Sequence, residues 1–290
     1  MRATAPGPSR GVRRISLDAG GIRLSAMLSR PPGAPRATVV ALHGAGMTSG
    51  YFDGQALPEL SLLTLGARLG FAVLAVDRPG YGRTAPHCPE GRSLHEQAAT
   101  LAAALRDFRR RFPAGEGHFL LAHSFGGKPA LLMAAEHPEP GLLGIDISGC
   151  GSRYAPGALD AAGAREGWRR SWGPLRLYPP NTFTAGHGTL VTTPARERAD
   201  LAHWPDVFRA VTARVRVPVR FTFAEHEPWW CHDEDTLADL RSRFSAAPHV
   251  RTERQWGAGH NISLGFAARS YHLRCLGFAE ECLMRRTEAA

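Results

Sequence analysis

The chain has 290 residues, 43% of them hydrophobic, which is enough for one large core together with a lid. No apolar run approaches the roughly 20 residues that a membrane helix needs, so we expect no membrane partner. The formal charge of +9 comes from arginines spread along the chain, because Lys128 is the only lysine. Without a basic arm or a nucleic-acid-binding module, this charge predicts no nucleic-acid partner.

The cysteines and the N-terminus both predict a cytoplasmic protein. The five cysteines lie far apart without a C-x-x-C pair, a pattern typical of reduced thiols rather than of a disulfide frame or a zinc site. Residues 1–14 carry arginine and proline but no apolar stretch like that of a signal peptide. We expect residues 1–11 to be loosely structured.

The first third of the chain predicts strands that alternate with loops and one helix. Two strands are expected within residues 12–29, around a turn at 18–21. Residues 37–42 and 71–76 are continuous apolar runs of the buried-strand type, and a helix is expected at 60–69 between them.

The next segments repeat the alternation of strand and helix. A helix begins at Ser93, where Ser93 and Glu96 fit a capping box, and its apolar residues then recur at helical spacing up to Phe112. Buried strands are expected at 118–123 and 141–148, with a helix at 128–136 between them. Strands that alternate with helices of this length predict an α/β fold, with a mostly parallel sheet covered on both faces.

The alternation stops at residue 149 and returns near residue 215. The intervening segment is rich in proline, glycine, arginine and aromatic residues, and we interpret residues 150–214 as a mostly helical cap. A strand at 217–223, a helix at 236–244, a short strand at 250–256 and a final helix at 262–285 complete the core. The expected division is therefore a core of residues 1–149 and 215–290 with the cap inserted.

A strand, a sharp turn and a helix meet at Ser124, within Ala122-His123-Ser124-Phe125-Gly126. Ala122 and Gly126 are small, as a cramped backbone requires, and a serine at such an apex points its hydroxyl out of the carboxyl edge of a sheet. The stretch resembles the G-x-S-x-G nucleophile elbow of the α/β-hydrolase superfamily, with Ala122 in place of the first glycine. The resemblance implies an α/β-hydrolase fold over about residues 12–149 and 215–285, with Ser124 as nucleophile.

That family places its acid and its histidine after the serine, on loops that follow later strands. His260 lies in a glycine-rich loop after a short strand, and it resembles the family's histidine in position. The strand at 217–224 resembles the family strand that precedes the acid, and its register puts Glu227 on the acid position. Glu225 is the alternative and Asp146 a weaker third choice, whereas Asp233 and Asp235 fit the start of the next helix.

Acyl transfer also needs donors aimed at the oxyanion that forms. The backbone amide of Phe125, directly after the nucleophile, is one candidate. The stretch His43-Gly44-Ala45-Gly46 follows a buried strand and resembles the family's H-G-x-G oxyanion loop, which makes the amide of Ala45 the second candidate. The resemblance also extends to residues 77–84, where Asp77 is expected to bond backbone.

These residues together predict a serine hydrolase that acts on an ester or thioester of a small, partly apolar metabolite. Trp168, Trp172 and Trp229 are candidate substrate-binding residues, although tryptophans of a cap can equally serve to attach it to the core. The histidines lack zinc-site spacing and no P-loop is present, so we expect neither metal nor cofactor. The alternative is a non-hydrolytic member of the fold, either a ligand-binding protein or a cyclase or acyltransferase. The oligomeric state is left open.

Overall fold

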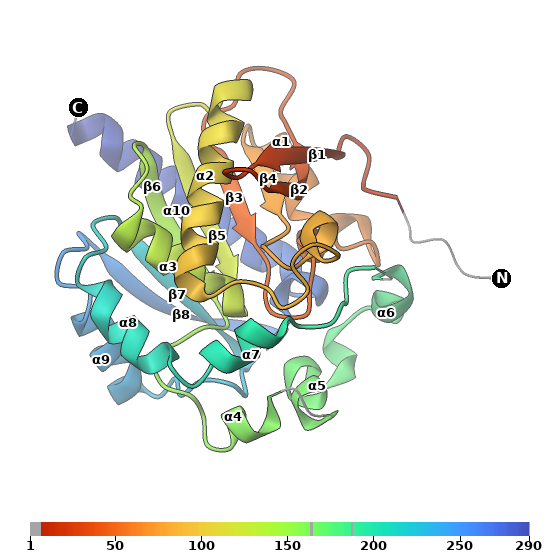
Figure 1. The fold of residues 1–290 in the computed structure, drawn as a ribbon, viewed down its shortest axis with the longest axis vertical. Helices are drawn as coiled ribbons and strands as arrows, with labels where there is room; N and C mark the ends of the chain where they lie inside the picture. Colours follow the sequence, from red (N-terminus) through yellow and green to blue (C-terminus); the bar gives the residue numbers. More distant parts are fainter. Residues whose placement is uncertain (1–6, 163–164, 187, 290) are drawn as a thin grey trace.

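The computed structural model describes residues 7–162, 165–186 and 188–289, and it contains one eight-stranded sheet (Figure 1). Residues 1–6, part of the segment expected to be loose, lie outside the described residues. The strand order is β1-β2-β4-β3-β5-β6-β7-β8, with β3 to β8 parallel and the β1–β2 hairpin antiparallel at one edge. The strands are β1 (Arg13–Asp18), β2 (Arg23–Ser29), β3 (Thr38–Leu42), β4 (Ala72–Val76), β5 (His118–His123), β6 (Leu142–Ser148), β7 (Val219–His226) and β8 (Val250–Gly259).

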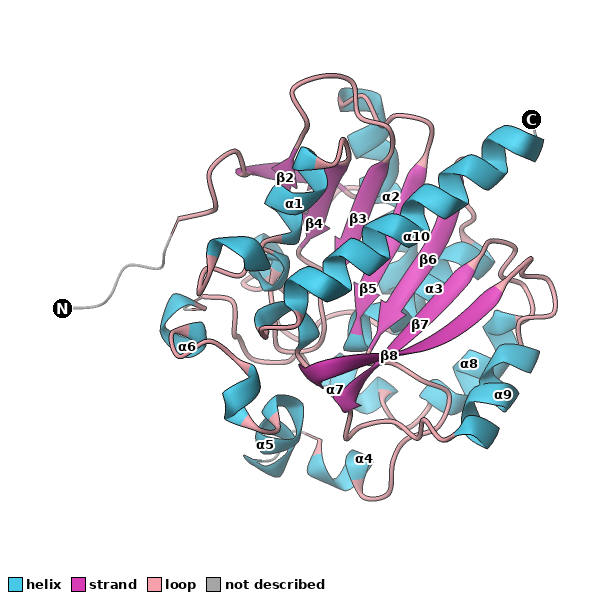
Figure 2. Ribbon diagram, turned by 180° about the vertical axis from the view of Figure 1, so that it is seen from behind, coloured by secondary structure: helices cyan, strands magenta, loops and turns pink. Residues whose placement is uncertain are grey.

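Helices cover both faces of this sheet, as Figures 1 and 2 show from opposite sides. One face carries α2 (Leu94–Arg111), α3 (Gly127–Glu136), α8 (Trp204–Thr212) and α9 (Glu234–Ser242), and the other carries α1 (Leu62–Arg68) and α10 (Ala268–Ala289). Each layer has its own apolar cluster against the sheet. The predicted α/β class, a mostly parallel sheet flanked by helices, is confirmed.

Local sequence explains these elements. The central strands β3, β4 and β5 are buried along their whole length, as expected of apolar runs in a parallel sheet with two covered faces. The predicted capping box of α2 is present: the Ser93 amide donates to a Glu96 carboxylate oxygen over 2.9 Å. Strand β8 is longer than predicted, because it pairs with β7 as far as Gly259 after a register shift.

Short helices gather at the carboxyl end of the sheet, outside both layers (Figures 1 and 2). Four of them come from residues 150–214: α4 (Ala158–Ala161), α5 (Arg165–Trp172), α6 (Thr182–Ala185) and α7 (Ala195–Asp200). Helix α8 comes from the same segment but packs on α3, with Trp204 and Phe208 fully buried in the core cluster. We therefore call α4–α7 and the loops between them the cap.

Six single-turn 3-10 helices complete the described structure. They lie mostly in the loops that follow the parallel strands, where the chain turns toward the next helix. They are η1 (Ser49–Phe52), η2 (Pro58–Leu60), η3 (Gly82–Thr84), η4 (Ser124–Gly126), η5 (Leu175–Leu177) and η6 (Ile262–Leu264). Of these, η4 is the turn that carries Ser124.

Candidate active site

Ser124 lies at the junction of β5 and α3 in a conformation that few residues adopt. Its φ of +52° is the only positive φ of a non-glycine residue in the described part of the chain. A side chain at Gly126 would place its Cβ 2.4 Å from the Leu42 carbonyl oxygen and 2.6 Å from that of His43. The turn therefore lies tightly against the end of β3 and needs the small residue that the sequence provides.

A chain of hydrogen bonds joins Ser124, His260 and Glu227. The Ser124 Oγ lies 3.0 Å from His260 Nε2, and His260 Nδ1 lies 2.8 Å and 3.0 Å from the two carboxylate oxygens of Glu227. The His260 and Glu227 side chains are almost fully buried. The geometry predicted for these three side chains, which come from turns after β5, β7 and β8, is present.

The alternative acids lie elsewhere. Glu225 accepts a hydrogen bond from the Gly257 amide over 2.8 Å. Asp146 is fully buried within β6, where it pairs with Arg220 of β7 and accepts from the Tyr271 hydroxyl over 3.2 Å. Neither carboxylate contacts the imidazole, so the register that favoured Glu227 agrees with the structure.

The imidazole of His260 is held from several sides. A Cβ at Gly149, where φ is +59°, would lie 2.8 Å from His260 Cε1, so the backbone after β6 closely supports the ring. The Trp229 amide donates to Glu227 over 3.0 Å and fixes the carboxylate. The His123 ring lies 4.9 Å from that of His260, and burial, with His260 acting in the same direction, lowers the pKa of His123 well below its ordinary value.

Two backbone amides near Ser124 are available as donors. In the described part of the chain, neither the Ala45 amide nor the Phe125 amide has a hydrogen-bond partner. The next amide, that of Gly46, donates to the Tyr81 hydroxyl over 3.1 Å. The loop of residues 43–46 also lies close to the nucleophile, because a Cβ at Gly44 would come within 3.0 Å of the Ser124 Cβ.

Ser124 opens into a cavity of about 400 Å³ between the sheet and the cap. Its wall is rich in aromatic rings and includes the three tryptophans proposed to bind substrate. Trp168 is 50% exposed, Trp172 is only 2% exposed and packs on Tyr178, and the Trp229 ring lies 6.3 Å from that of His260. The structure thus places all three at the cavity, but in different surroundings.

The wall of the cavity also includes Lys128, for which no role is predicted from the sequence. Its side chain is 1% exposed, and its ammonium donates to the Tyr154 hydroxyl over 2.7 Å. The Nζ also lies between 4.9 and 5.7 Å from four ring centroids, those of Phe125, Tyr154, Trp204 and Trp230. Burial lowers the pKa of Lys128 to about 8, while the surrounding ring faces favour the cation.

Comparisons with known proteins agree with the fold. A profile of the alpha/beta hydrolase fold matches residues 37–140. A thermostable carboxyl esterase from Bacillus coagulans superposes with a TM-score of 0.70 at 19% identity, over 95% of this chain and 100% of that chain. The chain has the fold of the α/β hydrolases.

The relatives found by sequence carry the names of hydrolases. Human monoglyceride lipase is 32% identical over 109 residues, which is 38% of this chain and 33% of the lipase. The putative carbamate hydrolase RutD of Cronobacter turicensis is 26% identical over 86% of this chain and 92% of its own length. The match therefore spans about a third of the lipase and nearly all of RutD.

Two further findings concern the described part of the chain. None of its helices is both long and apolar enough to cross a membrane. Its His, Cys, Asp and Glu side chains form no group of three or more that could hold a metal ion.

Replacing Gly126 by alanine tests the tight contact between the turn and β3. We expect Gly126→Ala to cost about 1–3 kcal/mol of unfolding free energy, because a Cβ cannot fit against the Leu42 carbonyl, and to lower any Ser124-dependent turnover at least about tenfold. Gly277→Ala is the control: a Cβ added at this helical glycine would meet no atom within 4 Å, and the change should be neutral or stabilising by up to about 1 kcal/mol. Thermal unfolding and turnover, measured for both variants, would show whether only Gly126→Ala loses stability and activity. A Gly126→Ala protein with the stability and turnover of the wild type would contradict this prediction.

The tryptophans of the cap should separate into two kinds. Trp168→Ala should raise KM or change substrate preference with less than about 1 kcal/mol lost in stability, because its ring is half-exposed at the cavity. Trp172→Ala should instead cost about 3–5 kcal/mol, because its ring is buried. Denaturant unfolding and Michaelis–Menten kinetics measure both effects, and equal stability losses in the two variants would refute the distinction.

Proposed function

We propose that this protein is a serine hydrolase that cleaves an ester or thioester through an acyl-enzyme formed on Ser124. The observation that carries the proposal is the continuous hydrogen-bond chain from Ser124 through His260 to Glu227. A serine hydroxyl becomes an effective nucleophile when an oriented base takes its proton, and this chain provides both base and orienting carboxylate.

In the proposed reaction, Ser124 Oγ attacks the acyl carbon while His260 Nε2 takes its proton. The carbonyl oxygen becomes an oxyanion, which the amides of Ala45 and Phe125 would stabilise by hydrogen bonds. Collapse of this intermediate breaks the bond to the leaving group, which receives the proton from His260. Water then attacks the acyl-enzyme by the same steps, releasing the acid and restoring the Ser124 hydroxyl. Glu227 stabilises the imidazolium that forms each time.

The cavity supports a small, partly apolar substrate. Its volume of about 400 Å³ is within the ordinary range of small-molecule sites, and its wall is rich in aromatic rings. Lys128 and Arg198 belong to the wall, whereas no aspartate or glutamate is among its described residues. The resulting positive potential favours neutral or anionic acyl groups over cationic ones. A panel of p-nitrophenyl esters and acyl-thioesters should include matched members of each charge.

A non-hydrolytic role, as a ligand-binding protein, is the alternative. It would leave the Ser124 hydroxyl unreactive toward acyl and phosphonyl electrophiles, so reaction with a fluorophosphonate separates the two functions. A cyclase or acyltransferase would be labelled but would pass the acyl group to an acceptor other than water, which product analysis distinguishes.

The nucleophile is tested by Ser124→Ala. We expect the wild-type protein to be labelled by a fluorophosphonate probe at Ser124, and the variant to lose labelling and about 10⁴–10⁶-fold in kcat. The fold should be retained, because alanine removes only the hydroxyl and the thermal transition should therefore change little. Turnover at the wild-type level in Ser124→Ala would refute the proposed function.

The acid is tested by a matched pair of variants. Glu227→Gln should lower kcat by about 10³–10⁴-fold, because an amide cannot stabilise the imidazolium that forms on His260. Glu225→Gln, near the end of β7 and bonded to the Gly257 amide, should keep kcat within a few-fold of wild type. The assignment fails if the Glu225 variant shows the larger loss.

A further inference from the structure

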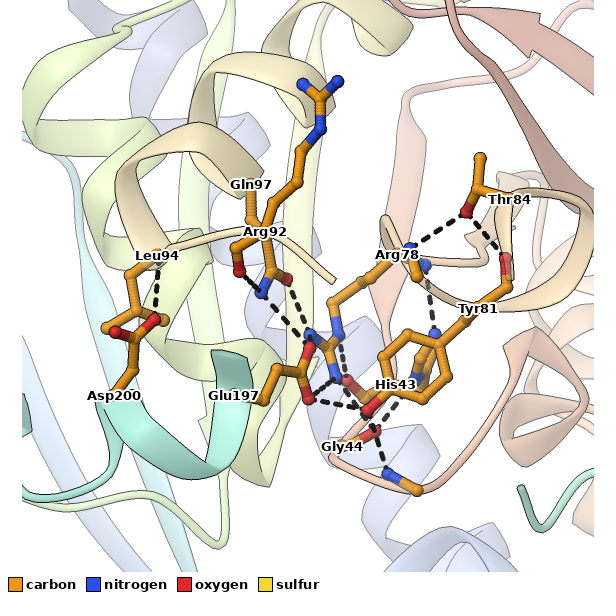
Figure 3. Close-up of polar contacts among 12 residues, drawn as sticks. His43, Gly44, Arg78, Tyr81, Thr84, Arg92, Leu94, Gln97, Glu197 and Asp200 are labelled. Atoms are coloured by element: carbon orange, nitrogen blue, oxygen red, sulfur yellow. Dashed lines mark hydrogen bonds and ion pairs between the residues drawn. The ribbon is translucent and has the colours of Figure 1, made fainter. Parts of the chain in front are cut away.

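A buried ion pair joins the cap to the core next to the candidate oxyanion loop. Arg78, in the loop after β4, and Glu197, on α7, form a two-pronged contact across 119 residues of sequence, and both side chains are 0% exposed (Figure 3). Gln97 of α2 donates to the same Glu197 carboxylate over 3.2 Å and accepts from Arg78 over 2.7 Å. Burying two charges costs desolvation free energy, which their attraction offsets only when their remaining polar atoms also form hydrogen bonds. Here the carboxylate of Glu197 and the guanidinium of Arg78 both have such further partners.

The other donors of Arg78 hold the backbone that precedes Ala45. Its Nε donates to the His43 carbonyl over 2.8 Å and its Nη2 to the Gly44 carbonyl over 3.1 Å. Its own amide donates to His43 Nε2 over 3.1 Å, and the guanidinium stacks 4.9 Å from the Phe125 ring centroid. Arg78 therefore contacts both segments whose amides are the candidate oxyanion donors.

Tyr81 holds the backbone that follows Ala45, and its hydroxyl is also hydrogen-bonded to Glu197. The Tyr81 hydroxyl donates to the Glu197 carboxylate over 2.6 Å and accepts from the Gly46 amide over 3.1 Å. Figure 3 shows Arg78 and Tyr81 converging on the same carboxylate from the loop after β4. Both flanks of Ala45 are thus fixed through a single glutamate of the cap.

The cap touches the same loop a second time through its backbone. The Val191 amide donates to the Gly46 carbonyl over 2.9 Å, and the Thr48 amide donates to the Thr189 carbonyl over 3.0 Å. Helix α7 is in turn docked on the start of α2, where Asp200 accepts from the Leu94 amide over 3.1 Å (Figure 3). The position of α7 and the conformation of residues 43–46 are therefore mechanically connected.

We propose that Glu197 is a positioning residue through which docking of the cap sets the geometry of the oxyanion loop. This inference rests on the proposed function. When α7 is docked, Glu197 holds Arg78 and Tyr81, and these hold the backbone on either side of Ala45. When Glu197 is removed or withdrawn, the buried guanidinium loses its counter-charge and the carbonyls of His43 and Gly44 lose a fixed donor. The Ala45 amide then loses its alignment with the oxyanion.

Two substitutions of Glu197 and one of Tyr81 test this coupling. Glu197→Gln and Glu197→Ala should lower kcat about 10- to 100-fold with KM within about threefold, because an oxyanion donor acts mainly in the transition state. Tyr81→Phe, which keeps the ion pair, should show a smaller loss in kcat. Binding of a trifluoromethyl ketone, whose serine adduct carries an oxyanion, should weaken in parallel with kcat/KM in all three variants.

Asp200→Asn is the matched control. It lies on the same helix as Glu197, and the amide oxygen of asparagine can still accept from the Leu94 amide, so the docking of α7 is kept while a carboxylate is neutralised. In the described part of the chain, its side chain has no hydrogen bond or ion pair to residues 43–46. Its kcat should stay within about twofold of wild type when thermal unfolding shows a folded protein. Tyr81→Phe keeps the test decisive even where the Glu197 variants fail to fold, because it removes a single hydroxyl.

Three results would overturn the inference. The first is wild-type kcat in folded Glu197 or Tyr81 variants, and the second is a rise in KM with kcat unchanged, which would make Glu197 a substrate contact. The third is an affinity for the trifluoromethyl ketone that does not follow kcat/KM. If a fluorophosphonate fails to label the wild-type protein at Ser124, the proposed function itself is wrong. If the wild-type protein is labelled but the Glu197 and Tyr81 variants keep the wild-type kcat, only the coupling is wrong.

Discussion

The contact between the turn at Ser124 and the carboxyl end of β3 is the constraint on which the rest of the site depends. It requires a residue without a side chain at Gly126 and a positive φ at Ser124, so the strained turn is held by the sheet rather than by its own preferences. Because the parallel strands all end at this edge, the loops after β3, β7 and β8 deliver their side chains to the same place. The hydrogen bonds of His260 and the position of the Ala45 amide follow from that arrangement.

Much of this arrangement could be predicted from short stretches of sequence. The buried strands β3, β4 and β5 appear as apolar runs, and the turn at Ser124 appears as a strand followed by small residues and a helix. Glu227 could be placed because the strand at 217–224 resembles the family strand that precedes the acid, and the structure agrees with the register that this resemblance implies. Short stretches of sequence were therefore sufficient to predict which residues meet at the edge of the sheet.

The remaining features depend on contacts between distant parts of the chain, which a sequence pattern does not encode. Nothing near Glu197 indicates that a glutamate flanked by arginines would be fully buried against Arg78. Trp168 and Trp172 look alike in sequence, yet Trp168 is half-exposed, whereas Trp172 is buried and packs on Tyr178. Helix α8 follows the cap in sequence but packs with the core, since its apolar side chains meet α3.

The enclosed position of Lys128 has a consequence for the chemistry of the protein surface. Because the chain has no other lysine, the folded protein presents no lysine amine to solvent. Reagents that acylate amines should therefore find no exposed lysine to modify in the native protein. Enzymes that mark proteins for turnover by forming an isopeptide bond to lysine would gain access to Lys128 only after the aromatic rings around it separate.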